Sequence, residues 1–324
     1  MTPFDTVFDD YANFSNPEHT PELPIKSAPN LGEKMIGHGA FTTTIDIGEG
    51  KVAKLSRMLG QKDGPFRVDA NDGAYLVSKT EDEEQDKKEV IQSMLDLAKE
   101  KEETYKMLGE YIGEYLPDIY FYAIVESPRK EIERYKGSNR PSGPDLSNIP
   151  TSEVSLMEVW EQIDARGSLS NMQYEQLTEL QGMENFKTQL ADLSSKAYSL
   201  LLKEGIMLDI CDWVGVRGTT PNKSGAPVKK LEDLLTERDK ATLFVPRNIA
   251  WSNEQIKYFD TYPVFDVYDL IDHTTLVKLC DLAELEDWPR IQEMCTNGGD
   301  KKAQLEQVAR YLFLLQQMGT NLRQ

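Results

Sequence analysis

The order of sequence patterns along the chain limits its fold more than any single motif does. Short runs of β-branched and aromatic residues, with one long amphipathic stretch among them, occupy the first half of the 324 residues. Helical periodicity dominates the second half. Strands and helices that are segregated in this way indicate an α+β protein rather than alternating βα units. The length fits one large domain or two smaller ones, and we expect two lobes.

The overall charge disfavours several classes of partner. The chain has 36 Lys+Arg residues against 55 Asp+Glu residues, which gives a formal net charge of −19. This charge opposes nonspecific binding to nucleic acid and to anionic membranes. No apolar run approaches the roughly 18 residues of a membrane-spanning helix, and the acidic start resembles neither a signal peptide nor a transit peptide. We therefore expect no nucleic-acid partner and no membrane partner.

Cysteine and histidine are too scattered to form a metal centre of their own. The chain has three Cys and three His residues, and they form no cluster. This pattern argues against a structural zinc site and against a histidine-based catalytic triad. An odd number of scattered cysteines is typical of a reducing compartment, so we expect a cytoplasmic protein.

A hairpin and then a long helix are expected in the first half. Residues 1–28 form an irregular lead-in. Strands over 41–47 and from residue 51 flank Gly48-Glu49-Gly50, a pattern typical of a β-hairpin. A helix is expected over 80–115, on this series of apolar residues at helical spacing: Ile91, Met94, Leu95, Ala98, Tyr105, Leu108 and Ile112.

The end of that helix and the segments after it follow from proline and apolar patterning. Leu116-Pro117-Asp118 ends the helix, because proline cannot continue it. Residues 119–125 are expected to form a strand, 127–150 an exposed loop, and 154–159 another short apolar run.

The second half is expected to be mostly helical. An amphipathic helix that includes Phe186 and Leu201 ends before Gly205. Two β-like pieces are expected around residues 243–245 and 255–259, and helices from residue 264 to the end. A polar segment of Gly, Pro and charged residues precedes the first of these pieces.

Glycines near the first hairpin suggest phosphate chemistry. Gly37 and Gly39 belong to the sequence Ile36-Gly37-His38-Gly39-Ala40-Phe41, and Lys54 lies on the following strand. Glycines let backbone N–H groups approach a phosphate closely, and a lysine neutralises its charge. The alternative is a tight turn followed by an ordinary surface lysine.

Glu102 is an anomaly in the long helix. At about 100° per residue it falls on the apolar face, between Ala98 and Tyr105. A carboxylate on a buried face needs a cationic partner, and Lys54 is the candidate. In the alternative, the last turns of the helix reach solvent and leave Glu102 exposed.

Two oxygen-bearing residues flank a second predicted hairpin. Asn248 enters it and Asp260 leaves it, with Asn253-Glu254 at the turn. A hairpin brings its ends together, so an amide oxygen and a carboxylate there can share Mg²⁺, which prefers oxygen ligands. The alternative is that both residues are loop caps.

Taken in order, residues 30–270 resemble the protein-kinase-like superfamily. Gly37-x-Gly39-x-Phe41 is similar to its glycine-rich loop, Val52-Ala53-Lys54 to the strand with the phosphate-binding lysine, and Glu102 to the helix glutamate that pairs with that lysine. The resemblance implies an α+β, two-lobed, protein-kinase-like fold. Its parts would be a small β-rich N-lobe with one long helix (29–158) and a larger, mostly helical C-lobe (159–324).

The same resemblance assigns the remaining site residues. It implies that the backbone around Glu158 and Trp160 holds adenine, that Asn248 and Asp260 bind magnesium, and that Asp209 is the catalytic base. ATP and Mg²⁺ are the implied cofactors, with a small-molecule or protein acceptor. No Ala-Pro-Glu follows Asp260, which makes the chain more similar to aminoglycoside- and choline-kinase-type phosphotransferases than to regulated protein kinases.

Departures from the family pattern concern the catalytic loop. Met207-Leu208-Asp209 stands where the family has His-Arg-Asp, and the glycine loop has Thr42 in place of its third glycine. The family places its Asp five residues before its Asn, whereas Asp209 and Asn248 lie 39 apart, which implies an insert at about 211–246. Asp212 is a rival for the base position.

Three functions remain open on this pattern. The first is transfer of the γ-phosphoryl group of ATP to a hydroxyl or amine acceptor. The second is a pseudokinase, a nucleotide-binding or protein-interaction module without catalysis. The third is transfer of AMP to the acceptor, for which the sequence gives no positive sign.

Overall fold

The computed structural model describes most of the chain. The described residues are 35–38, 42–56, 58–61, 68–69, 74–78, 83–126, 154–163, 168–169, 172, 174–210, 215–217, 224–227, 230–238, 243–246, 248–259, 261 and 264–319. The expected lead-in at 1–28 and the expected loop at 127–150 lie outside these ranges.

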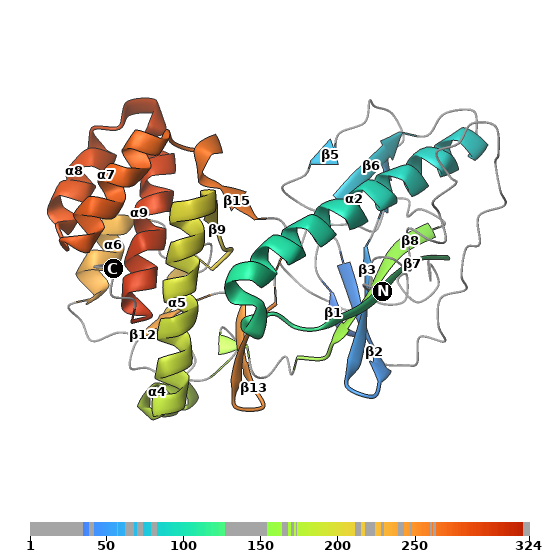
Figure 1. The fold of residues 1–324 in the computed structure, drawn as a ribbon, viewed down its shortest axis with the longest axis horizontal. Coiled ribbons are helices and arrows are strands. Elements are labelled where there is room, and N and C mark those ends of the chain that lie inside the picture. Colours follow the sequence, from blue (N-terminus) through green and yellow to red (C-terminus); the bar gives the residue numbers. More distant parts are fainter. Residues whose placement is uncertain are drawn as a thin grey trace. The chain divides into compact units, whose positions relative to one another are not determined.

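The chain separates into two compact units. The first comprises residues 1–103 and 117–162, and the second comprises residues 104–116 and 163–324. Figure 1 labels helices and strands of both units.

A five-stranded antiparallel sheet forms the centre of the first unit. Its strand order is β1-β2-β3-β8-β7. The strands are β1 (Met35–His38), β2 (Thr42–Gly48), β3 (Lys51–Ser56), β7 (Ile119–Glu126) and β8 (Val154–Glu161). The expected hairpin is confirmed as β2 and β3. Its tip, Gly48-Glu49-Gly50, has three consecutive positive φ angles of 85°, 54° and 70°, and glycine adopts the first and the last without strain.

A second small sheet in this unit was not predicted. It has the order β4-β6-β5 and consists of β4 (Met58–Gln61), β5 (Val68–Asp69) and β6 (Ala74–Ser78). Strands of two to five residues are too short to show a clear alternating pattern.

The long helix forms as predicted. Helix α2 spans Glu83–Ile112, and a 3₁₀ turn (η1, Gly113–Tyr115) follows it. Leu116 is extended and Pro117 comes next, so the helix ends where the sequence indicated. The predicted apolar face is buried at Met94, Leu95, Ala98, Leu108 and Ile112.

Helices dominate the second unit. They are α4 (Tyr174–Gly182), α5 (Glu184–Glu204), α6 (Leu231–Arg238), α7 (His273–Glu284), α8 (Trp288–Thr296) and α9 (Lys302–Gln317), with 3₁₀ turns η4 (Val267–Asp269) and η5 (Gly299–Lys301). Their apolar faces form one core, which includes Leu193, Leu200, Leu279, Ile291, Leu312 and Phe313. Trp288 and Phe313 meet edge to face, with ring centroids 5.1 Å apart.

Gly205 ends α5 as the sequence indicated. Its φ is 71°, and its N–H donates to the carbonyl oxygen of Leu201. A Cβ at this position would lie 2.4 Å from the ring of Tyr268, so any larger residue collides with that ring. The backbone angle favours glycine here, and any other residue would also require the exposed Tyr268 side chain to move.

The expected insert contains regular structure. Strands β10 (Gly215–Arg217), β11 (Ser224–Pro227) and β12 (Leu243–Val245) form a sheet in the order β11-β10-β12. Helix α6 lies in the same segment, contacts α9, and buries Leu231 and Leu234 in the core of the unit.

Two short strand pairs complete the second unit. Strand β9 (Ile206–Met207) pairs with β15 (Phe265–Asp266), and β13 (Ile249–Ser252) pairs with β14 (Gln255–Tyr258). Ser252 is opposite Gln255, which leaves a two-residue turn at Asn253 and Glu254, with φ angles of 52° and 61°. Both left-handed angles fit the primed turn typical of tight hairpins.

The α+β class expected from the sequence is confirmed, with a small antiparallel sheet and several helices. Within the described ranges, no helix has the length and apolar character needed to span a bilayer.

Candidate functional site

The site residues expected in the first unit lie on three strands and one helix. Gly37 is in β1, Lys54 in β3, Glu102 in α2, and Glu158 and Trp160 are in β8. Gly39 and Phe41 lie outside the described residues, so the proposed glycine-rich loop is described only at its first glycine.

Lys54 faces the side chains of β8. It is half-buried, and it is directly opposite Glu158 in the β3–β8 register. Its Nζ lies 3.7 Å from the centroid of the Trp160 ring. A cation over the face of an indole is attracted by the ring quadrupole. The lysine is therefore held at the sheet by an aromatic contact.

Glu158 is the centre of a buried charge cluster. It is 1% exposed, and its Oε1 forms an ion pair with Lys101 of α2. Its Oε2 accepts a hydrogen bond of 3.0 Å from Nε1 of Trp160. Because a buried carboxylate is stable only when it is paired and hydrogen-bonded, Lys101 and Trp160 account for the burial of Glu158.

Glu158 and Trp160, around which the family resemblance implies an adenine contact, lie in the interior of the sheet. Strand β8 is an interior strand: Glu158 pairs with Lys54 on one side and Tyr122 on the other, and Trp160 pairs with Val52 and Ile119. The main chain at both residues is therefore engaged by neighbouring strands. The side chains of these residues contact two lysines, Lys54 over Trp160 and Lys101 at Glu158. The adenine contact stays a prediction.

Lys101 was missed by the sequence analysis. The apolar periodicity of α2 drew attention to Glu102 alone, whereas Lys101 is the adjacent residue and sits at the edge of the buried face, with 15% of its side chain exposed. No local pattern marks it, because its partner is 57 residues away.

Glu102 is buried, as the helical projection predicted. It is 8% exposed. The alternative, in which the end of the helix exposes it, is wrong. Its pairing with Lys54 stays a prediction.

Two expected site residues of the second unit come together although they are far apart in sequence. Nδ2 of Asn248 donates to the main-chain oxygen of Asp209 at 2.8 Å and to its Oδ2 at 3.0 Å. Asn248 is 5% exposed and has a φ of 60°, a left-handed conformation that asparagine tolerates better than most residues. The intervening segment of the chain therefore leaves and returns to one place.

The end of the second hairpin brings Asn248 close to the residue before Asp260. The N–H of Phe259 donates to the carbonyl oxygen of Asn248 at 3.1 Å. Asp260 and Asp212 lie outside the described residues, so the expected pair of metal ligands is described at Asn248 only, and the rivalry between Asp209 and Asp212 stays open. Among the described residues, no three His, Cys, Asp or Glu side chains are grouped to hold a metal ion.

The chemistry of Asn248 fits a magnesium ligand. Its Nδ2 is directed to Asp209, so Oδ1 is the atom that would reach a cation. Amide and carboxylate oxygens are the ligands that Mg²⁺ prefers.

Two tyrosines also contact this loop, and the sequence analysis missed both. The Tyr258 hydroxyl accepts a hydrogen bond from the N–H of Asp209 at 3.0 Å, and the Tyr311 hydroxyl accepts one from the N–H of Leu208 at 3.2 Å. Tyrosines in an apolar strand and helix are indistinguishable from core residues in a sequence, which is why no signal marked them.

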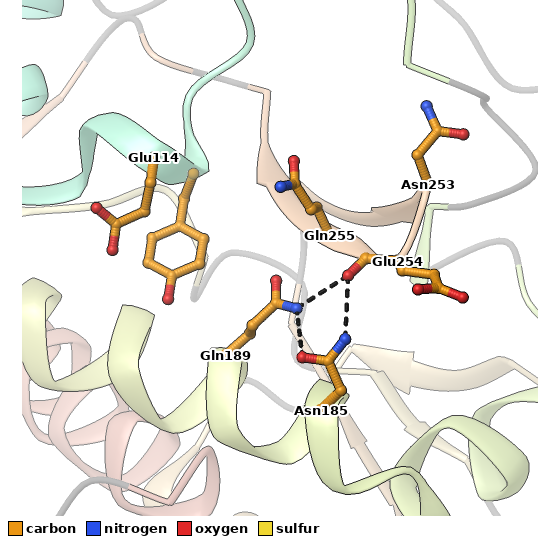
Figure 2. A pocket seen from close by; sticks show the side chains of 7 residues that line it. Glu114, Asn185, Gln189, Asn253, Glu254 and Gln255 are labelled. Carbon is orange, nitrogen blue, oxygen red and sulfur yellow. Dashed lines mark hydrogen bonds between the residues drawn. The ribbon is translucent and has the colours of Figure 1, made fainter.

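A polar pocket of about 460 Å³ lies elsewhere in the second unit (Figure 2). It is lined by Glu114, Tyr115, Asn185, Gln189, Asn253, Glu254 and Gln255. Its amides support the β13–β14 turn: Nε2 of Gln189 donates to the Glu254 carbonyl at 2.9 Å, and its Oε1 accepts from the N–H of Ile256 at 2.9 Å. None of the expected site residues lines this pocket.

Charged groups near the pocket form a separate network. Lys196 pairs with Glu114 and, at 2.7 Å, with Asp192, whose Oδ2 also accepts from the Tyr115 hydroxyl at 2.6 Å. Burial raises the pKa of Tyr115. Burial opposes ionisation of Asp192, but the hydrogen bonds from Lys196 and Tyr115 outweigh it and lower the pKa of that carboxyl. This network stabilises the charged forms of Asp192 and Lys196, and none of its residues belongs to the expected site.

The two described cysteines are unsuited to nucleophilic chemistry. Burial raises the pKa of Cys280 to about 12 and that of Cys295 to about 11. Both thiols are therefore protonated near neutral pH, and a protonated thiol is a poor nucleophile.

Comparison with known proteins gave no relative: no protein-family model, no curated protein and no solved structure matches this chain.

Proposed function

We propose that this chain is an ATP- and Mg²⁺-dependent phosphotransferase with a two-lobed, protein-kinase-like fold. It would move the γ-phosphoryl group to a hydroxyl or amine acceptor. The observation that carries this proposal is the contact between Asn248 and Asp209, at 2.8 and 3.0 Å, across 39 residues of sequence. The family resemblance assigns these two residues to metal binding and catalysis from sequence alone.

The strand order of the first unit supports the same proposal. The central sheet has the order β1-β2-β3-β8-β7, with a long helix inserted between its third and fourth strands in the sequence. Lys54 lies on the middle strand, as expected for a phosphate-binding lysine. Hydrogen bonds to the neighbouring strands fix the main chain at Lys54 and therefore the point from which its side chain extends.

Phosphoryl transfer needs positioning and charge neutralisation more than covalent chemistry. Lys54 would bind the α- and β-phosphates, and Asn248 and Asp260 would hold Mg²⁺. When bound, the metal supplies positive charge beside the phosphates. Asp209 would orient the acceptor and accept its proton as the new oxygen–phosphorus or nitrogen–phosphorus bond forms. The bond between the γ-phosphorus and the β–γ bridging oxygen would break in the same step, and ADP would leave.

A second candidate, a pseudokinase without catalysis, is favoured by a specific observation. Met207 and Leu208 stand where the family has His and Arg, and both are buried apolar side chains. The pairing of Glu158 with Lys101 is a further departure, because here a helix lysine pairs with a strand glutamate. A binding module would keep the fold and lose turnover.

ADP release from ATP with Mg²⁺, measured with a panel of alcohol and amine acceptors, tests the proposal. The Asp209→Asn variant should turn over at a rate lower by about 1,000-fold, because it removes the base and preserves the shape of the side chain. Asp233→Asn, an exposed residue of α6, is the matched control and should behave like the wild type. Equal turnover in wild type and Asp209→Asn rejects the assignment.

Two further measurements separate the candidate functions. A thermal shift with ATP and Mg²⁺ but no turnover on the whole panel supports the binding module. Intact mass after incubation with ATP identifies transfer of AMP, because an added nucleotide is far heavier than an added phosphate.

A further inference from the structure

The two residues before Asp209, Met207 and Leu208, have apolar side chains. Met207 and Leu208 are 2% and 1% exposed, and neither can donate or accept a strong hydrogen bond. The chain turns tightly here, because the N–H of Ile210 donates to the Leu208 carbonyl at 2.8 Å. The main-chain N–H groups of Leu208 and Asp209 are bonded by groups from other elements.

Two buried tyrosines supply those groups. Tyr258, at the end of β14, and Tyr311, inside α9, are both fully buried. Their hydroxyls accept the adjacent N–H groups of Asp209 and Leu208, at 3.0 and 3.2 Å. Two consecutive main-chain N–H groups thus bond to two tyrosine side chains, one from a strand and one from a helix. These tyrosines are 53 residues apart in the sequence.

Asp209 is consequently held at three atoms. Its N–H contacts Tyr258, and its carbonyl oxygen and Oδ2 contact Asn248. Tyr258 is also linked to Asn248 through the hairpin, because it pairs with Ile249, the next residue. These contacts fix the main chain and leave the direction of the carboxylate little freedom.

We propose that Tyr258 and Tyr311 are positioning residues that orient the Asp209 carboxylate for catalysis. The proposal rests on the proposed phosphotransferase function. The two hydroxyls take over the support that a histidine and an arginine within the loop would otherwise give. Neither tyrosine is assigned a contact with nucleotide or acceptor.

Removing one hydroxyl at a time tests this. Tyr258→Phe and Tyr311→Phe keep the rings and hence the packing. Tyr198→Phe is the matched control, because Tyr198 is also buried in this unit and its hydroxyl bonds to Glu284 at 3.1 Å, not to the Asp209 loop. The full-length chain is used throughout, with ADP release from ATP and Mg²⁺ as the assay.

The expected result is a loss of kcat with an unchanged KM for ATP. We expect Tyr258→Phe to lose about 10- to 100-fold in kcat, because small misplacements of a catalytic group cost rates of this order. Tyr311→Phe should lose less, since it acts through Leu208, and Tyr198→Phe should stay within about two-fold of wild type. Equal losses in all three variants, or a change in KM alone, overturn the proposal.

Hydrogen exchange keeps the test independent of the proposed function. Amide exchange in the peptide that covers residues 205–210, measured without nucleotide, should be faster in Tyr258→Phe and Tyr311→Phe and unchanged in Tyr198→Phe. If wild type releases no ADP, the phosphotransferase proposal fails, and the orienting role fails with it. Unchanged exchange in all variants shows that the hydroxyls do not hold the loop.

Discussion

Two carboxylates, one in each unit, are fixed by different chemistry. Glu158 lies inside a sheet and is held by charge, through the ammonium of Lys101 and the indole N–H of Trp160. Asp209 lies on a tight turn, and the contacts described for it come from neutral groups, the Asn248 amide and the Tyr258 hydroxyl. The charge of the buried Glu158 is compensated by a lysine, whereas the half-buried Asp209 is oriented by hydrogen bonds.

This difference indicates a structural role for Glu158 and a chemical role for Asp209. A buried carboxylate that pairs with a lysine stabilises the fold through that ion pair, and loss of its charge breaks the pair in a largely buried site. Asn248 and Tyr258 are neutral, so neutralising Asp209 breaks no ion pair with either of them. We therefore expect an isosteric neutral substitution to cost more stability at Glu158 than at Asp209.

The largest effect on stability is expected at Glu158. Glu158→Gln should lower the free energy of unfolding by about 3 kcal/mol, because it leaves the ammonium of Lys101 in a largely buried site. Urea denaturation followed by circular dichroism measures this. Asp209→Asn is the comparison, and a larger loss there than at Glu158 would reverse the contrast.

The double variant Lys101→Met/Glu158→Leu sharpens the same comparison. Replacing both ions by apolar side chains of similar size should recover most of the stability lost in Glu158→Gln. A double variant as unstable as the single one would mean that packing, not charge, sets the cost.

Asn248 gives the next largest effect. Asn248→Ala should destabilise the chain by about 2 kcal/mol, since it removes two hydrogen bonds and places alanine at a φ of 60°. Asn248→Gly removes the same bonds without the backbone cost, so it should lose about 1 kcal/mol. Thermal denaturation of the pair checks this. Equal losses would show that the left-handed angle carries no cost.

Trp160→Phe is expected to cost about 1.5 kcal/mol. The change removes the N–H donor to Glu158 and weakens the ring contact with Lys54. Urea denaturation measures the loss, and Trp251→Phe, an aromatic swap at a partly buried position outside this cluster, is the control.

The smallest effect is a pH dependence at Asp192. Because the folded-state pKa of Asp192 lies below its ordinary value of 3.8, its stabilising contribution is present above that value and is lost as the pH falls through the folded pKa. The carboxylate is half-exposed, so the contribution should stay below about 1 kcal/mol. The stability difference between wild type and Asp192→Asn, measured from pH 6 downward, should shrink; a constant difference contradicts this.

Periodicity predicted the long elements well. Helix α2, its end at Pro117, and the glycine that ends α5 followed from the spacing of apolar residues and from backbone restrictions, which are local properties. The strands β4, β5, β6, β10 and β11 were missed because two to five residues carry too little pattern.

The site depended on contacts that sequence spacing does not encode. Asp209 and Asn248 were connected only through a family resemblance, because 39 residues separate them. Lys101, Tyr258 and Tyr311 were missed because each is recognisable only by its partner in space. Glu158 and Trp160 were singled out by the resemblance, and the structure adds their contacts with Lys101 and Lys54, which no spacing indicated.

The hydrogen bonds between Asn248 and Asp209 have a topological consequence. They bring both ends of the segment that carries β10, β11, α6 and β12 to one point. A segment that departs and returns at the same place can change in length at little entropic cost to the remainder. We therefore expect the chain to tolerate insertions and deletions in this segment, provided that Leu231 and Leu234 remain buried against apolar side chains.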